Sequence, residues 1–480
     1  MSTLNDTLII KEAMENTPTT APVESTSEDV EKPNICEFNR VNIDSLVKKG
    51  DINMVDTDDD HKLDMFCYVK CDDSNDDIIK KCRGVVFNGE TIVMKAFPYT
   101  TEYNNTEMDN IGSYLHDFQN WNFYESHEGA LIRLFFYENK WFVSTHRKLN
   151  AFKSKWASQE SFGTLFKNAL LAEEENNTKF KDCLPDGENI IERFRSTLDK
   201  NKQYMFLVRN TSENRIVCSP PDRSTVYHVG TFVEGELVLD ENINIPHPKQ
   251  LTFTSVEDLC SHVNDLGFEH IQGVIGMTAD NRQVKIVNND YQDLFNVRGN
   301  EPSIKFRYLQ VRMNSKYVDM LYYLYPNMAD VFDDYENMLY DIALSIYNSY
   351  VTRFIKKTYN TVPRDEFAVI RECHSWHISN RSENRISLEK VINVLNQQSP
   401  THLNHMIRRC KLEKFRQPVQ SSGGGQFVSK TVSNEMPMSP LRLPVNKLHM
   451  TKQYDKKEQT RVVTILKRQP LYKPKTEATT

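Results

Sequence analysis

The chain lacks the long apolar runs that mark membrane proteins. No stretch of about 18 consecutive apolar residues occurs among its 480 residues. The first residues also lack the basic-then-apolar pattern of a secretory signal. We therefore expect a soluble protein that is not secreted. A hydrophobic content of 39% is enough for a substantial core in roughly two or three domains, and no internal repeat is evident.

The cysteines lack the spacing of a disulfide framework. Nine thiols, an odd number, are scattered along the chain, which favours reduced cysteines in an intracellular setting. Two groups of thiols and imidazoles approach a metal-site pattern, but neither has the paired spacing of structural zinc, and we predict no metal at either. They are Cys67, Cys71 and Cys82 with His61, and Cys373 with His374 and His377.

The formal net charge of −7 conceals an acidic N-terminal segment and a basic C-terminal segment. Residues 1–38 hold eight acidic side chains against two basic ones, whereas residues 417–480 hold eleven basic against four acidic. Both ends have too few apolar residues to offset chain entropy, so we predict that both are disordered. A basic tail favours salt-sensitive attraction to nucleic acid, although it can also serve only to keep a protein soluble.

Between the ends, the pattern predicts an α+β region at 39–310 with antiparallel sheets, then a small all-helical domain at 311–416. The expected strands are 84–88, 91–97, 131–145 as a hairpin, 204–208, 215–219, 226–233, 274–277 and 283–287. The expected helices are 162–172, 189–198, 317–325, 328–359, 364–375 and 387–397. Pro326 and Pro363 act as helix breakers.

The segment from Tyr124 to Trp156 combines an acidic-glycine bend with a hairpin that ends in positive charge. Glu128-Gly129 predicts a tight bend at which a backbone can approach a ligand. After the hairpin, cations gather on His146, Arg147, Lys148, Lys153 and Lys155. Such a cluster suits a polyanion held near the end of a sheet, and it is equally typical of a solvated surface.

Short motifs follow one another in a fixed order over residues 60–310. They are Cys82-Arg83-Gly84-Val85-Val86-Phe87, Ser126-His127-Glu128-Gly129, residues 141–149, Asn214-Arg215-Ile216-Val217, Gln272-Gly273-Val274-Ile275, and Val284-Lys285-Ile286-Val287 followed by Tyr291. The ordered set resembles the adenylyltransferase domain of the T4 RNA ligase 1-like family. That family has an Arg-Gly segment, Lys-x-Asp-Gly, a second lysine across a hairpin, a glutamate before Asn-Arg-Ile-Val, a Glu-Gly motif and Lys-x-Lys before a tyrosine.

The resemblance implies a nucleotidyltransferase-like fold, with ATP and Mg²⁺ as cofactors. In such ligases a lysine amine attacks the α-phosphate of ATP and keeps the AMP as a phosphoramidate. Glutamates bind the nucleotide and the metal, and cations balance the charge that develops on the phosphates. An amine cannot be exchanged for a hydroxyl without changing this reaction.

The chain departs from the family at the positions that carry the chemistry. Ser126 stands at the nucleophilic lysine, and Glu128 stands at the motif aspartate before Gly129. The other replacements are His146 at the second lysine, Leu207 or Val208 at the first glutamate, Gln272 at the later glutamate and Val287 at the second lysine of Lys-x-Lys. Ser126 cannot form a lysyl-AMP, so the resemblance implies an active site that has lost this step.

The resemblance and the charge pattern together give a set of candidate residues. The nucleotide-binding candidates are Arg83, Gly84, His146, Gln272, Lys285 and Tyr291, beside Ser126, Glu128 and Gly129 at the former catalytic motif. The nucleic-acid candidates are Arg133, Arg147, Lys148, Lys153 and Lys155. Each also has a plain structural reading: Arg83 can pair with an acid, Lys285 can be an exposed strand residue, and Tyr291 can be core.

We therefore predict an RNA-ligase-like protein with a degenerate active site that binds RNA ends, nucleotide or both. Two alternatives stay open. One is an active ATP-dependent ligase that takes its nucleophile from Lys148, Lys153 or Lys155, and the other is a scaffold whose helical domain docks a partner protein. The expected setting is intracellular, in the cytoplasm or a viral factory of a host cell, because the composition and the ligase-like arrangement resemble proteins of large DNA viruses.

Overall fold

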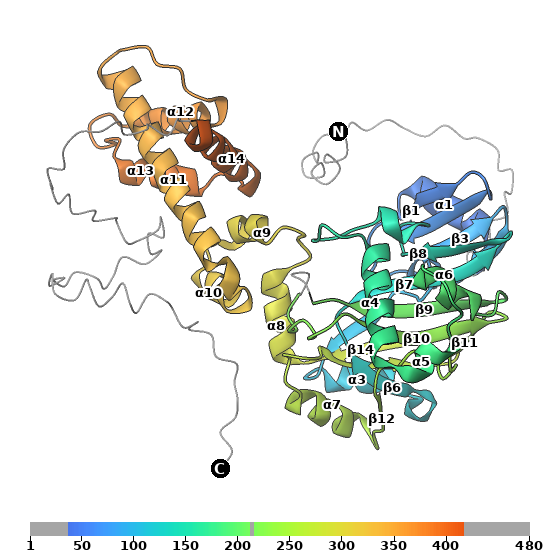
Figure 1. The fold of residues 1–480 in the computed structure, drawn as a ribbon. Coiled ribbons are helices and arrows are strands. Elements are labelled where there is room, and N and C mark those ends of the chain that lie inside the picture. Colours follow the sequence, from blue (N-terminus) through green and yellow to red (C-terminus); the bar gives the residue numbers. More distant parts are fainter. Residues whose placement is uncertain (1–36, 212–215, 417–480) are drawn as a thin grey trace, which may run out of the picture.

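The computed structural model describes residues 37–211 and 216–416. A sheet-rich part comes first in the chain, and a helical part extends from one side of it (Figure 1). In the described ranges the strands form three sheets, which share a core cluster that includes Met65, Phe135, Met205 and Met277. This cluster fixes the sheets against one another and so positions the loops at their ends.

The first sheet is a four-stranded antiparallel meander. Its order is β1 (Ile52–Asp58), β2 (Leu63–Tyr68), β3 (Arg83–Asn88) and β4 (Thr91–Met94). Helices α1 (Arg40–Lys49) and α2 (Asp77–Lys81) cover one face, where Ile43 and Ile78 pack with Phe66. The opposite face joins the shared core. Asn39 caps α1 by accepting a hydrogen bond from the backbone of Asn42, which fixes where that helix begins.

The second sheet has the order β11-β10-β9-β7-β8 and is antiparallel throughout. Its strands are β7 (Ala130–Tyr137), β8 (Lys140–Ser144), β9 (Lys202–Arg209), β10 (Thr225–Val233) and β11 (Glu236–Val238). Strands β7 and β8 meet at a two-residue turn in which Glu138 and Asn139 both have positive φ. Helices α4 (Phe162–Asn176), α5 (Thr178–Cys183) and α6 (Ile190–Ser196) pack over one face, after a short 3₁₀ turn at Ala151–Lys153.

The third sheet is mixed, with the order β12-β6-β13-β14-β5. It consists of β5 (Thr101–Asn104), β6 (Asn122–Ser126), β12 (Gln250–Leu251), β13 (Gly273–Met277) and β14 (Gln283–Val287), and β14 pairs with β5 in parallel. Helices α3 (Met108–Tyr114) and α7 (Val256–Asp265) cover it.

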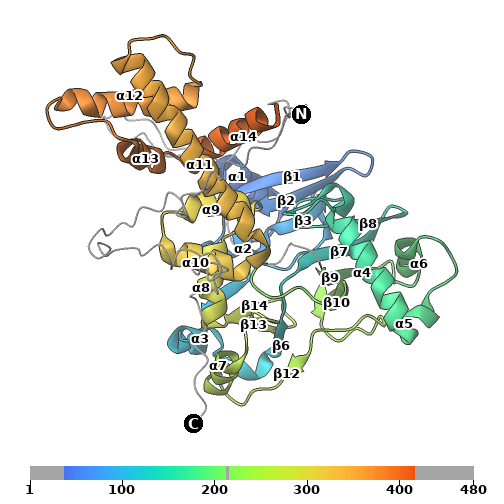
Figure 2. The same ribbon diagram turned by 60° about the vertical axis from the view of Figure 1, so that its left-hand side comes forward.

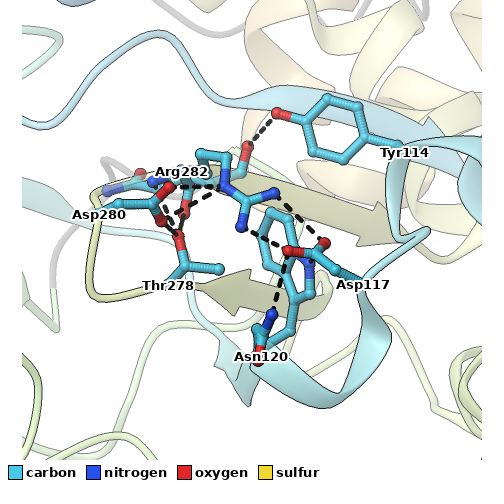
Figure 3. A network of polar contacts seen from close by, with 8 residues as sticks. Tyr114, Asp117, Asn120, Thr278, Asp280 and Arg282 are labelled. Atoms are coloured by element: carbon cyan, nitrogen blue, oxygen red, sulfur yellow. Dashed lines mark hydrogen bonds and ion pairs between the residues drawn. The ribbon is translucent and has the colours of Figure 1, made fainter.

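A polar network fastens the outer end of this third sheet (Figure 3). Arg282, beside the β13–β14 turn, donates to both carboxylate oxygens of Asp117, at 2.7 and 3.3 Å, and also binds Asp280. Asp117 comes just before the 3₁₀ turn Phe118–Asn120, and hydrogen bonds from Arg282 hold the pKa of this carboxyl well below its usual range. The network therefore ties the hairpin to the segment that leads into β6.

The helical part continues from the sheets without a break in packing. It comprises α8 (Asn289–Arg298), α9 (Ile304–Val311), α10 (Ser315–Leu324), a 3₁₀ turn at Pro326–Met328, α11 (Ala329–Tyr350), a π turn at Val351–Ile355, α12 (Arg364–Ser379), α13 (Leu388–Asn396) and α14 (Pro400–Arg416). One core cluster contains Val287 and Tyr291 together with Leu339 and Ile407. Figures 1 and 2 show α11 as the long axis of this part.

The structure confirms the expected fold class, a mixed sheet region followed by helices. Two element predictions were wrong. Residues 216–219 form no strand, and the helix expected to reach residue 359 leaves regular α geometry at Val351. The domain division at 310/311 stays a prediction; it falls at the end of α9, whose Tyr308 shares the core of the later helices. The predicted disorder of 1–38 and 417–480 lies almost wholly outside the described residues.

Candidate functional site

The register of the third sheet puts the family's key positions in one row. Gly273 of β13 pairs with Ser126 of β6 on one side and with Val287 of β14 on the other. The row therefore holds the residues that the motif resemblance assigns to the nucleophilic lysine, the Glu-Gly glycine and the second lysine of Lys-x-Lys. Ser126 is 4% exposed. Gly273 has φ +152°, and a Cβ there would lie 2.0 Å from the carbonyl oxygen of Ile286, so only glycine fits.

Glu128, in the loop between β6 and β7, uses its carboxylate to hold another segment of the chain. The backbone amides of Ile216 and Val217 donate to it at 3.1 and 2.7 Å. Tyr291 lies beside it, and burial together with the charge of Glu128 raises the pKa of this tyrosine. Gly129 packs so closely on β9 that a Cβ would lie 2.7 Å from the carbonyl oxygen of Val208. The acidic-glycine bend thus contacts both the 216–217 segment, through Glu128, and strand β9, through Gly129.

His127, in the same β6–β7 loop, is held by a contact with Gln272. The amide of Gln272 donates to the carbonyl oxygen of His127 at 2.9 Å, and Gln272 is buried. The imidazole of His127 stacks on Tyr227, with ring centroids 5.0 Å apart. Burial, followed by the charge of Arg209, lowers the pKa of His127 to about 4, so its ring is neutral at physiological pH.

Lys285, the lysine retained in β14, is already paired. Its Nζ lies 2.5 Å from a carboxylate oxygen of Glu102, which is its register partner in β5. The lysine side chain is 16% exposed, whereas that of Glu102 is 43% exposed. A phosphate at this place would have to compete with an existing ion pair.

A second set of residues lies where β3 meets the end of the β7–β8 hairpin. Gly84 has φ +84°, and a Cβ there would lie 2.5 Å from the carbonyl oxygen of His146. Arg83 donates to the carbonyl oxygen of Pro98 at 3.3 Å and has no ion pair with a described carboxylate. Burial, and then the charges of Arg83, Arg133 and Arg147, lower the pKa of His146 to about 3. His146 is therefore a neutral group in a positive surrounding.

Arg133 does not lie on the surface, and its expected contact with nucleic acid is not supported. It is 1% exposed, and its guanidinium donates to the carbonyl oxygens of Gly84 and Thr145 at 2.5 and 2.6 Å. Burial lowers its pKa to about 9, so it stays charged at neutral pH. Arg133 thus fixes the Arg83-Gly84 segment against the hairpin and adds a buried positive charge beneath it.

The remaining cations of the hairpin end fall into two kinds. Lys148 forms an ion pair with Asp56 at 2.9 Å, and the other oxygen of that carboxylate accepts from the amide of Leu149. Arg147, Lys153 and Lys155 are exposed and, within the described ranges, have no carboxylate partner. These three keep their charge available to a ligand.

Sequence reasoning missed two charged residues near the Ser126-His127-Glu128-Gly129 segment and Lys285. Arg209 ends β9 and reaches the carbonyl oxygens of Ser219 and His270, at 3.5 Å each, without a carboxylate partner among the described residues. Glu102 neutralises Lys285. A cation directly after a predicted strand was a usable signal for Arg209, whereas the pairing of Glu102 depends on a parallel register that no local pattern reveals.

The donor set does not fit a divalent metal. The motif resemblance assigns the family's two glutamates to Leu207 or Val208 and to Gln272, and the carboxylate of Glu128 is occupied by backbone amides. In the parts of the chain that the structure describes, no three His, Cys, Asp or Glu side chains gather as a metal site. Nor, in those parts, is any helix long and apolar enough to cross a membrane.

Several known proteins are similar to this chain. The chain is 22% identical over 287 residues to a protein of Autographa californica nuclear polyhedrosis virus named "Putative bifunctional polynucleotide kinase/RNA ligase", covering 58% of this chain and 39% of that one. Among solved structures, an archaeal ATP-dependent RNA ligase is 9% identical, with a TM-score of 0.31, over 78% of this chain and 77% of that chain. A TM-score this low carries no argument. The ligase name belongs to that viral protein, to which this chain is similar over part of its length.

Two other viral proteins are more similar in sequence to the chain. The chain is 30% identical over 368 residues to the immediate-early protein ICP-46 homolog of Invertebrate iridescent virus 3, covering 72% of this chain and 78% of that protein. It is 27% identical over 395 residues to the homolog of Invertebrate iridescent virus 6, covering 76% and 83%. The chain belongs to the ICP-46 family of immediate-early proteins. No family model matches it.

Proposed function

We propose that this chain is an RNA-ligase-like protein that binds RNA ends or nucleotide phosphates without forming a covalent nucleotide adduct. The observation that carries the proposal is the row Ser126, Gly273 and Val287. Two of its three positions are those at which the family has lysines, and here neither side chain is an amine. A buried hydroxyl at Ser126 cannot supply the phosphoramidate bond.

The charges that are left free support binding rather than transfer. Arg83, Arg147, Lys153 and Lys155 have no ion pair with a described carboxylate, and Arg133 adds a buried charge beneath the first two. Phosphate groups are the ligands that such unpaired cations attract most strongly. The motif residues, in contrast, hold the fold together, since Glu128 holds the 216–217 segment and Lys285 is neutralised by Glu102.

In this proposal ATP is bound without reacting, and Mg²⁺ has no assigned role. The carboxylates that a hard divalent cation prefers are missing at Leu207 or Val208 and at Gln272, so no metal-dependent step is assigned. A nucleotide would be held through its phosphates by Arg83 and Arg147. The relatives are viral immediate-early proteins by name, which supports action inside the infected cell, in the cytoplasm or a viral factory.

The first experiment looks for a covalent adduct. Purified protein is incubated with α-labelled ATP or GTP and Mg²⁺ or Mn²⁺ and then run on a denaturing gel. The proposal expects no label on the polypeptide. A labelled band that disappears on one of the changes Lys148→Ala, Lys153→Ala or Lys155→Ala would contradict it and establish an active ligase with a displaced nucleophile.

The second experiment measures binding of single-stranded RNA with a 5′-phosphate as a function of salt. The triple change of Arg147, Lys153 and Lys155 to Ala should weaken binding and reduce the salt slope by about 2, because each phosphate contact on a single strand contributes about 0.7. Lys140→Ala is the matched control, because Lys140 lies on the same hairpin and is ion-paired with Asp58. Equal effects of both variants would show that the hairpin end does not contact the RNA.

A further inference from the structure

The end of α11 has an irregular backbone and an exposed aromatic loop. The helix passes at Tyr350 into the π turn Val351–Ile355, and Lys357, two residues further on, has φ +54°. Ile355 is 65% exposed, and Tyr359 is 83% exposed. Single π turns occur often at functional sites, and a lysine in the left-handed region is strained. An aromatic ring this exposed contributes nothing to the core.

The cations of this loop have no carboxylate partners within the described residues. Lys356 and Lys357 of the loop, and Arg364 at the start of α12, are all exposed and unpaired there. The cations of the neighbouring α14 behave differently: Lys414 pairs with Asp341 at 2.8 Å, and Lys411 pairs with Asp334 at 3.6 Å. Asp341 and Asp334 of α11 are therefore already paired with α14. The positive charge of the loop is left for a ligand.

A groove of about 490 Å³ lies directly beside the loop. Its polar lining is mostly uncharged, from Ser345, Asn348, Ser349, Thr352 and Asn360, and its one carboxylate, Asp341, is neutralised by Lys414. The loop and the groove are continuous, because the amide of Thr358 donates to the carbonyl oxygen of Thr352 at 3.0 Å. The Oδ1 atom of Asn360 is buried without a hydrogen-bond partner in the described structure.

We propose that this groove and the loop 355–359, together called the α11 tip, bind single-stranded RNA. A base would stack on Tyr359, phosphates would contact Lys356 and Lys357, and the hydroxyl and amide groups of the groove would meet a sugar or a base edge. Aromatic rings beside unpaired cations are the usual means of binding single strands without sequence preference. Neutral hydrogen-bonding groups suit the 2′-hydroxyl and base edges. The inference rests on the proposed function, since it assigns a second contact to the same RNA.

The position of the α11 tip makes this contact separate from the hairpin end. Figures 1 and 2 both show the loop between α11 and α12 at the end of α11 away from α10 and from the sheets. An RNA held at both places would therefore run along the helical part. Binding at the α11 tip and binding at the hairpin end can be removed independently.

The test is fluorescence anisotropy with a labelled oligouridylate of about 12 nucleotides, which is within the site sizes of single-strand binders. Tyr359→Ala should weaken binding about 10-fold, and Tyr359→Phe should retain it, because the ring is what stacks. Changing Lys356 to Ala and Lys357 to Gly together should reduce the salt slope by about 1.4, from two phosphate contacts. Lys411→Ala, which removes a paired lysine of the same part, serves as control.

The outcomes separate this inference from the function on which it rests. If the hairpin-end triple variant weakens binding and Tyr359→Ala does not, the α11 tip is excluded and the proposed function stands. If Tyr359→Ala weakens binding and the triple variant does not, the α11 tip is supported and the hairpin-end assignment fails. A wild-type protein that binds no RNA overturns both. Crosslinking of 4-thiouridine RNA to the peptide that contains Tyr359, lost in Tyr359→Ala, would support the contact directly.

Discussion

His146 makes the stability of the fold depend on pH in a way that can be calculated. Burial and three arginines lower the pKa of its imidazole from the ordinary 6.5 to about 3. The folded protein therefore keeps this ring neutral at pH values at which the unfolded chain takes up a proton. The stabilisation is fully present above pH 6.5 and is lost as the pH falls towards the folded pKa.

The size of the effect follows from these two pKa values. At about pH 5.5, roughly ten of every eleven unfolded chains carry the proton at this position and almost no folded chain does, which costs about 1.4 kcal/mol. His146→Gln removes the titrating group and keeps a neutral polar side chain. We expect the loss in the free energy of unfolding between about pH 7.5 and pH 5.5 to be about 1.4 kcal/mol smaller in the variant than in the wild type.

Urea unfolding at the two pH values, followed by tryptophan fluorescence, measures this difference. His405→Gln, which removes an exposed imidazole on α14, is the matched control. If the pH dependence of His146→Gln equals that of the wild type, the ring is protonated in the folded state. The electrostatic description of the Arg83-Gly84 region would then be wrong.

Three further changes test separate parts of the structure. Gly273→Ala should lower the free energy of unfolding in urea by about 2–4 kcal/mol, because the new Cβ would meet the carbonyl oxygen of Ile286. Gly267→Ala, whose Cβ would meet nothing within 4 Å, should lower it much less. Similar losses in both variants would refute the close approach at Gly273. Glu336→Gln should cost about 3–5 kcal/mol because it leaves the buried Arg312 unpaired, whereas replacing both by Leu and Met should cost less; a larger loss in the double variant would contradict this. Tyr325→Phe removes a donor to the carbonyl oxygen of Ile216 and should speed hydrogen exchange at the amides of Ile216 and Val217; unchanged exchange would show that the contact does not hold the segment.

Local patterns predicted β3, β4, β7, β8, β9, β10, β13 and β14, which are short runs of branched and aromatic residues between clear turns, but missed β1, β2, β5, β6, β11 and β12. The strand 283–287 was predicted at its observed bounds, and the β7–β8 hairpin was recognised from its turn. The failure at 216–219 has a tertiary cause. The amides of Ile216 and Val217 donate to the carboxylate of Glu128, about 90 residues away, rather than to a neighbouring strand.

The candidate site was predictable in its residue order and not in its pairings. Arg133 was a nucleic-acid candidate, but β7 is buried on both faces in its middle, where Ile132, Arg133 and Leu134 are all enclosed, so alternation could not show which way the arginine points. The pairing of Lys148 with Asp56 joins the segment after β8 to β1 of another sheet and has no local signal. The helix 328–359 was predicted too long for a local reason. The apolar periodicity continues through the π turn that begins at Val351, so the sequence does not mark where the α-helix ends.

The contact between Tyr325 and Ile216 makes the sheet-rich part depend on the helices that follow it. Tyr325 receives a hydrogen bond from Arg298 and gives one to the segment that Glu128 holds, while Tyr291 and Val287 sit in the interior formed by the later helices. A stop codon placed after α8 would strip the covering from these side chains and leave the catalytic-motif loop unsupported. The sheet-rich part should therefore not fold stably as an independent product.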